Sequence, residues 1–140
     1  MIRTTKKELT QIAIRWMEEG WQKGNIHIVD ELHSMNFIDH DPAGRTPDIE
    51  GFKEGIQQLY AAFPDLYAEV EDLVVDRESG KVAIRWTATG THTHIFMNAQ
   101  PTGKYVRIKG IEIIRIENGK IAERWGEWDG IELLQQLQGL

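Results

Sequence analysis

Two hydrophobic periodicities divide the chain. From Leu9 to Phe63 apolar residues recur every three or four positions, which is the spacing of one face of an α-helix. After Pro64 they alternate at every second position, as expected of half-buried β-strands. Helices therefore precede strands, an order typical of α+β domains in which helices cover one face of a mostly antiparallel sheet.

The first half contains three predicted helices. The first begins at the capping box Thr5-Lys6-Lys7-Glu8, in which the threonine covers a free N–H group and the glutamate reaches back. Its apolar stripe consists of Leu9, Ile12, Ala13, Trp16 and Met17. A short second helix follows Asn25, a brief extended piece covers residues 35–38, and a third helix is predicted over residues 49–63.

The second half indicates a meander of strands. The predicted elements are strands over residues 66–76, 82–90, 104–117 and 121–128 and a closing helix over residues 130–137. A slip in the alternation near Glu71-Asp72 predicts a β-bulge in the first of these strands. Asn118-Gly119 predicts a two-residue hairpin turn between the last two strands.

That turn fixes an expected register, in which directly opposed residues share the inward face of the sheet. The expected pairs are Ile116 with Ile121, Ile114 with Glu123, Glu112 with Trp125, Gly110 with Glu127 and Ile108 with Asp129. The inward face is then apolar near the turn and acidic at its far end. The outward face would carry Arg115, Arg124, Ile111, Ile113 and Trp128. A bulge would swap part of this assignment, because a shift of one residue turns every side chain to the other face.

Asp129 stands where the last predicted strand gives way to the closing helix. It can cap that helix by accepting hydrogen bonds from the free N–H groups of the first turn. It can also be a carboxylate at the mouth of a pocket, where it would serve as a general base or acid. The two roles are compatible.

Two histidines are candidates for the same pocket. His92 continues the inward phase of its strand, so it is either a core histidine with one hydrogen bond or a pocket acid or base. His40, in Asp39-His40-Asp41-Pro42, is either a loop histidine held by neighbouring carboxylates or a pocket residue. His94 shares a strand face with His92, but the spacing specifies no third ligand, and we predict no metal site. His27 and His33 are expected to be solvated.

Large aromatic residues and one carboxylate occupy positions that the pattern places inside. The aromatics are either core residues or the lining of an apolar cavity for a small organic ligand. Glu112 alternates with Ile108 and Ile114, although neighbouring basic side chains would neutralise it if the strands place them close. The candidate binding residues are Trp16, Phe63, Trp86, Ile108, Glu112 and Trp125.

Composition narrows the classes of function. The 140 residues include no cysteine, which excludes disulfides, thiolate zinc sites and a cysteine nucleophile. Sixteen Lys and Arg against 22 Asp and Glu give a formal net charge of −6, which argues against nucleic acid or an anionic membrane as partner. No stretch resembles a signal peptide or a membrane span, so we expect a cytoplasmic protein with one domain over residues 1–140.

Six short motifs span nearly the whole chain in order. They are Phe37-Ile38-Asp39-His40-Asp41-Pro42, Phe63-Pro64-Asp65-Leu66, Gly90-Thr91-His92-Thr93, Pro101-Thr102-Gly103-Lys104, Asn118 to Trp125, and Asp129 to Leu137. Their order and spacing resemble the SnoaL-like polyketide cyclase, or ester cyclase, family of the nuclear-transport-factor-2-like superfamily.

The resemblance implies a cone-shaped α+β barrel, a cavity between helices and sheet, and a homodimer formed through the outer sheet face. It also implies ring closure of a polyketide by intramolecular aldol chemistry without metal or organic cofactor. Asp129 matches the catalytic acid/base of the family, and His40 and His92 match positions that commonly line its pocket. Some characterised cyclases carry a histidine that hydrogen-bonds the catalytic aspartate. The strand before the hairpin has none here, and Glu112 stands on its inward face.

The sequence thus predicts a cofactor-free acid/base enzyme that acts on a small apolar carbonyl compound, with Asp129, His92 and His40 as catalytic residues. Three alternatives stay open. One is a non-catalytic protein that binds a small molecule on the same scaffold. Another is a sibling activity such as an isomerase or an epoxide hydrolase. The third is an interaction module whose interior is filled by side chains.

Overall fold

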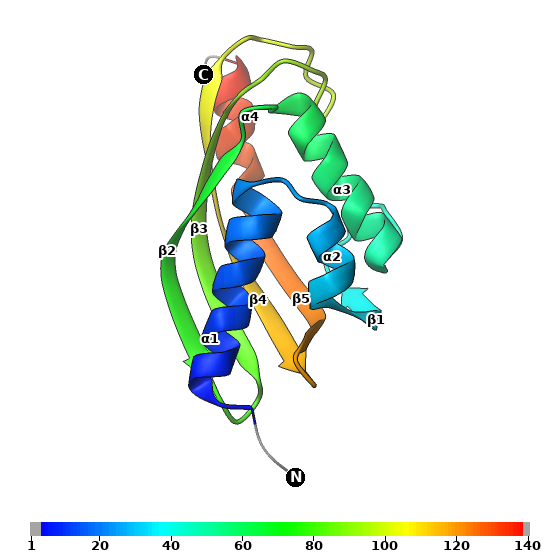
Figure 1. The fold of residues 1–140 in the computed structure, drawn as a ribbon. Coiled ribbons are helices and arrows are strands. Elements are labelled where there is room, and N and C mark those ends of the chain that lie inside the picture. The colour runs from blue at the N-terminus through cyan, green and yellow to red at the C-terminus, as the bar shows by residue number, and fades with distance from the viewer. Residues whose placement is uncertain (1–3, 139–140) are drawn as a thin grey trace.

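A curved five-stranded sheet is covered on its inner face by helices, as Figure 1 shows for the computed structural model, which describes residues 4–138. The helices are α1 (Lys6–Arg15), α2 (His27–Leu32), α3 (Ile49–Ala62) and α4 (Gly130–Gln138), and a π-helical segment, η1 (Trp16–Gln22), continues α1. The strands are β1 (His33–Asp39), β2 (Tyr67–Asp76), β3 (Lys81–Thr91), β4 (Tyr105–Glu117) and β5 (Lys120–Trp128). No helix within residues 4–138 is long and apolar enough to cross a membrane.

The strand order is β1-β5-β4-β3-β2. β1 runs parallel to β5, and the other neighbours are antiparallel. The predicted α+β class and cone-like arrangement are confirmed. The sheet is open, with β1 and β2 as its edges.

The first helix begins where the capping box predicts. The Thr5 hydroxyl accepts the Glu8 N–H at 3.1 Å. After Arg15 the chain widens into the π-helical turns of η1, a form that is rare and often found at functional sites. A Cβ atom on Gly20 would lie 2.4 Å from the ring of Trp16, so only glycine lets that indole fold back against its own helix.

The register of β4 and β5 corrects the sequence-based expectation. The pair Ile116–Ile121 occurs as predicted, but the register shifts by one residue immediately afterwards. Ile114 then faces Arg124, and Ile113 faces Trp125. One extra residue in β5 is enough to exchange the two faces. Arg124 therefore points inward, where Glu123 was expected. The expected β-bulge in β2 is confirmed, as a register shift between Val70 and Asp72.

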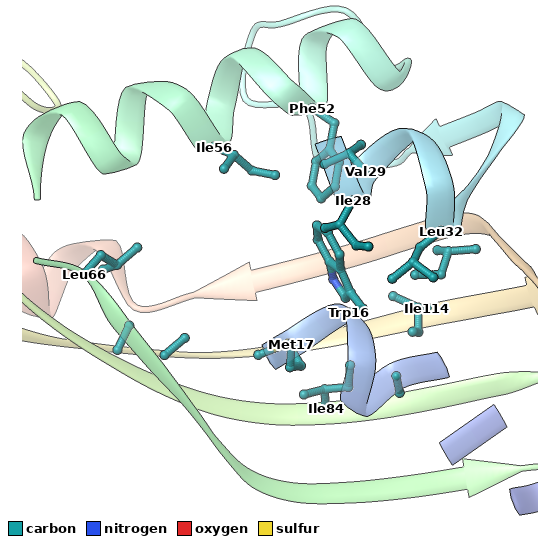
Figure 2. Close-up of a cluster of buried hydrophobic side chains, with 14 of the residues drawn as sticks. Trp16, Met17, Ile28, Val29, Leu32, Phe52, Ile56, Leu66, Ile84 and Ile114 are labelled. Carbon is teal, nitrogen blue, oxygen red and sulfur yellow. The ribbon is translucent and has the colours of Figure 1, made fainter. Parts of the chain in front are cut away.

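The core lies between the sheet and helices α1, α2 and α3. Figure 2 shows Trp16 in its middle, between Phe52 of α3 and the strands that carry Ile84 and Ile114. Trp16 is completely buried, and its ring lies 5.8 Å from that of Phe52. Each large apolar side chain removed from water in this way contributes about 1.5–3 kcal/mol to folding. Trp16 and Phe63, both expected binding residues, are fully buried members of this core.

Candidate functional site

One end of the sheet brings together the segments that carry Asp129 and His92. β3 and β5 are both antiparallel to β4, so their carboxyl-terminal ends lie at the same end of the sheet. His92 follows β3 and Asp129 follows β5. Figure 1 shows α4 and the loop between β3 and β4 at this end. The loop is tied to the end of α3, because the Thr93 N–H donates to the carbonyl oxygen of Ala62 at 2.8 Å.

Asp129 is the N-cap of α4, as predicted. Its Oδ1 accepts the Glu132 N–H at 2.9 Å, and its own N–H donates to the carbonyl oxygen of Lys109 at 3.0 Å. Within residues 4–138, no hydrogen bond engages its second carboxylate oxygen, Oδ2. The side chain is therefore anchored through one of its two carboxylate oxygens.

His92 is completely buried and held from three directions. Its N–H donates to the Lys104 carbonyl, and its carbonyl accepts the Gly103 N–H, both at 2.9 Å. Its ring Nδ1 accepts the Thr102 N–H at 3.2 Å and lies 3.0 Å from the Thr102 hydroxyl. Among the described residues, Nε2 is the one buried side-chain polar atom without a hydrogen-bond partner. His92 is therefore a buried histidine whose ring is hydrogen-bonded through Nδ1 alone, as one of the two expectations has it.

A row of aromatic rings leads from His92 to the neighbourhood of Asp129. The Phe63 ring lies 5.5 Å from His92 and 5.4 Å from Phe96. Phe96 lies 6.4 Å from Trp128, the residue directly before Asp129. These distances are typical of interacting aromatic pairs. Trp128 is 41% exposed, so the row reaches the surface at its outer end.

Trp86 and Ile108 lie on the same inner face, as expected. Trp86 faces Gly110 across the strands, and Gly110 also faces Trp128. A Cβ atom on Gly110 would lie 2.5 Å from the ring of Trp86, so the missing side chain is what lets the indole lie against β4. Ile108 is buried, whereas Trp86 is only partly buried.

The structure separates His40 and Trp125 from this end of the interior. Trp125 faces Ile113 on the outer side of the sheet, and the His40 ring stacks on it at 4.7 Å. The His40 Nε2 lies 3.6 Å from Glu123. A hydrogen bond from Arg115 lowers the pKa of Glu123, and His40 adds to that effect. The expectation that His40 and Trp125 line the inner pocket is therefore wrong in their placement, because the register shift turned this part of β5 outward.

Glu112 points inward, as predicted, and belongs to a buried charged cluster. Its Oε2 lies 3.2 Å from Arg124 Nε, and its Oε1 accepts the Trp16 Nε1–H at 3.3 Å. Arg124 also pairs with Asp39 at 2.9 Å. Burial alone would lower the pKa of Arg124, but the two carboxylates outweigh it and raise that pKa above its usual value. The sequence does not predict that Arg124 and Asp39 belong to this cluster. The expected register placed Arg124 on the outward face of the sheet, away from both carboxylates.

His33 was expected in solvent and is in fact buried beside this cluster. Its ring lies 4.7 Å from Trp16 and 4.8 Å from Phe37, and its Nδ1 lies 2.9 Å from the Val29 carbonyl oxygen. Burial lowers the pKa of His33 to about 4. Its Nδ1–H therefore donates to Val29 in the neutral form, and the ring serves as a core aromatic.

Two surface hollows lie away from this end of the sheet. One, of about 310 Å³, lies between α1 and the turn into β5, and another, of about 320 Å³, lies beside the outer face of β1 and β5. Neither of these two is lined by Asp129, His92 or Trp86. Side chains such as Trp16 and Glu112 fill the space under the helices. Neither of these two hollows opens onto His92.

Comparisons with known proteins agree on one family. The family model for the SnoaL-like polyketide cyclases matches residues 11–137. TsrD from Streptomyces laurentii superposes with a TM-score of 0.86 at 24% identity, covering 98% of this chain and 99% of its own, which bears on the fold alone. A proposed polyketide cyclase from Bacillus cereus is 31% identical, with a TM-score of 0.81 and coverage of 96% and 85%.

A third structure of the same fold belongs to a protein with a different proposed activity. AclR from Streptomyces galilaeus, a proposed hydroxylase, is 26% identical with a TM-score of 0.85, covering 97% of this chain and 84% of its own. None of the curated proteins matches the chain.

Proposed function

Because the chain belongs to the SnoaL-like polyketide cyclase family, we propose that it is a cofactor-free acid/base enzyme that closes a ring in a small apolar carbonyl compound. The observation that carries this proposal is the setting of Asp129. One carboxylate oxygen is anchored at the start of α4, and the neighbouring Trp128 begins an aromatic row that runs inward to His92. An anchored carboxylate that keeps one oxygen for a proton suits proton transfer from carbon.

The proposed reaction is an intramolecular aldol addition in which all atoms are conserved. Asp129 removes a proton from the carbon next to a carbonyl group, leaving an enolate. The enolate carbon attacks a second carbonyl carbon of the same molecule, which forms the new C–C bond and an alkoxide. The alkoxide then takes the proton back from Asp129. The aromatic row would hold the folded substrate in place, and such orientation supports an intramolecular closure.

The experiment follows exchange of the α-proton of ethyl 2-methylacetoacetate for deuterium by NMR, since this probe needs only the first step. Asp129→Asn should keep the cap, because asparagine caps as well as aspartate, and should lower the exchange rate about 100-fold or more. Asp48→Asn is the matched control, since Asp48 caps α3 through Gly51 in the same way. It should leave the exchange rate unchanged.

Two results would count against the proposal. Exchange at the wild-type rate in a folded Asp129→Asn variant would remove Asp129 from the role. Wild-type protein that binds the β-keto ester without accelerating its exchange would favour a non-catalytic binding protein. The interaction module has an observation of its own, because side chains fill much of the space under the helices.

A further inference from the structure

We propose that His92 is a fixed hydrogen-bond donor that recognises a carbonyl or enolate oxygen through Nε2, and that Thr102 is the positioning residue that keeps the ring proton there. The inference rests on the proposed function, because it names the ligand group that His92 meets at the inner end of the aromatic row.

The hydrogen bonds at Nδ1 determine which ring nitrogen of His92 carries the proton. The Thr102 N–H donates to Nδ1 at 3.2 Å, and a nitrogen that accepts a hydrogen bond carries no proton of its own. The Thr102 hydroxyl, 3.0 Å from Nδ1, accepts the Lys104 N–H at 3.2 Å, which leaves its own proton to point at the ring. Two donors therefore face Nδ1. The ring is neutral with its proton on Nε2.

The ring and the backbone of His92 are held rigidly. The same short segment that faces the ring also holds the backbone of His92, through Lys104 and Gly103. The backbone and the ring are thus fixed by residues 102–104 together, in a side chain that is completely buried. A donor held in this way needs no reorganisation when charge develops on a ligand oxygen, which is the property that makes such donors effective in catalysis.

The chemistry of Nε2–H determines which ligand group it can bind. Nε2–H is buried and has no acceptor among the described residues, and buried donors are almost always paired. Its neighbour along the row, Phe63, offers a ring and no acceptor oxygen. A ligand that brings an oxygen acceptor to Nε2 completes the pairing. An ammonium group, which can only donate, would meet a second donor there, so the site selects carbonyl compounds against ammonium compounds of similar shape.

The first experiment reads the tautomer and its response to a ligand by NMR on the 15N-histidine-labelled full chain, with His92→Gln used to assign the signal. We expect His92 protonated at Nε2. Acetophenone should shift the Nε2–H resonance, whereas α-methylstyrene, which replaces the C=O group by C=CH₂, should leave it unchanged. A proton on Nδ1, or equal responses to both compounds (no response to either included), would overturn the proposal.

The second experiment separates donor loss from fold loss. His92→Leu should lower the kcat/KM of the exchange reaction about 100-fold, the typical effect of removing one such donor. His92→Gln keeps an N–H near the position of Nε2 and should stay within about 10-fold of wild type. His94→Leu, at an exposed neighbouring position, should leave kcat/KM unchanged.

The outcomes distinguish the two proposals. Exchange that depends on Asp129 but is equal in His92→Leu and wild type would overturn the role of His92 and leave the proposed function intact. Absence of exchange in wild type would count against the proposed function, and the acetophenone titration would then decide the role of His92 by itself.

Discussion

At the scale of single residues, His33 makes stability depend on pH. Burial lowers its pKa from 6.5 to about 4 in the folded state. The unfolded chain therefore takes up the proton first as the pH falls below 6.5, so the free energy of unfolding decreases with falling pH until about pH 4. The loss attributable to this one side chain should be about 3 kcal/mol.

The measurement is urea unfolding of wild type and His33→Asn between pH 7 and pH 4. Asparagine keeps a donor for the Val29 carbonyl oxygen but does not titrate. The difference between the two proteins in free energy of unfolding should shrink or reverse as the pH falls. Parallel curves would show that His33 is not the titrating group.

How well the sequence predicts single residues depends on whether their roles are local. The capping roles of Thr5 and Asp129 are local, because the hydrogen-bond partner lies three residues ahead. His33 and Arg124 could not be predicted, because their burial comes from partners far along the chain. Arg124 pairs with Asp39 across 85 positions. The sequence does place Glu112 on the inward face of its strand. A buried carboxylate predicts a positively charged partner, but the pattern does not identify which residue that partner is.

At the scale of elements, periodicity predicts the helices and strands but not their irregularities. The π-helical turns of η1 contain the same apolar stripe as an α-helix, so Trp16 was expected inside without its contact to Glu112. The turn Asn118-Gly119 occurs where the sequence predicts it. The extra residue directly after Ile121 does not interrupt the alternation of apolar and polar residues, so the sequence does not predict it. Because of this, the expected register places every later side chain of β5 on the wrong face.

Helix α4 supplies hydrogen-bond partners to the backbone of β4 at the end of the sheet where β5 has stopped. The Gln136 side-chain amide accepts the Arg107 N–H and donates to the Arg107 carbonyl oxygen, both at 2.8 Å, as a neighbouring strand would. Gln136→Ala should therefore lower the free energy of unfolding by about 1 kcal/mol. It should also speed hydrogen exchange at the Arg107 amide, measured by NMR. Gln135→Ala is the control at an exposed position on the same helix and should change neither quantity.

At the scale of the whole molecule, the outer sheet face is the proposed surface of a homodimer. Ile111 is 51% exposed and Ile113 36% exposed in the middle of this face, next to Trp125. Apolar residues gathered on one sheet face favour association. Ile113→Lys should convert a dimer into a monomer in sedimentation velocity at micromolar concentration. Met35→Lys, on the edge strand β1 and 95% exposed, should leave the dimer intact, and a wild-type monomer would contradict the proposal.

The parallel pairing of β1 with β5 has a consequence for how the chain is made. β1 ends at Asp39, and its one neighbour in the sheet begins at Lys120, so the strand has no partner while the intervening residues are being synthesised. During synthesis, β1 therefore leaves the ribosome long before the β4–β5 hairpin. Its edge has no strand to pair with until that hairpin emerges. Until then the salt bridge between Asp39 and Arg124 cannot form. A chaperone or another nascent copy of the chain that binds unpaired strand edges would therefore bind β1 during this interval.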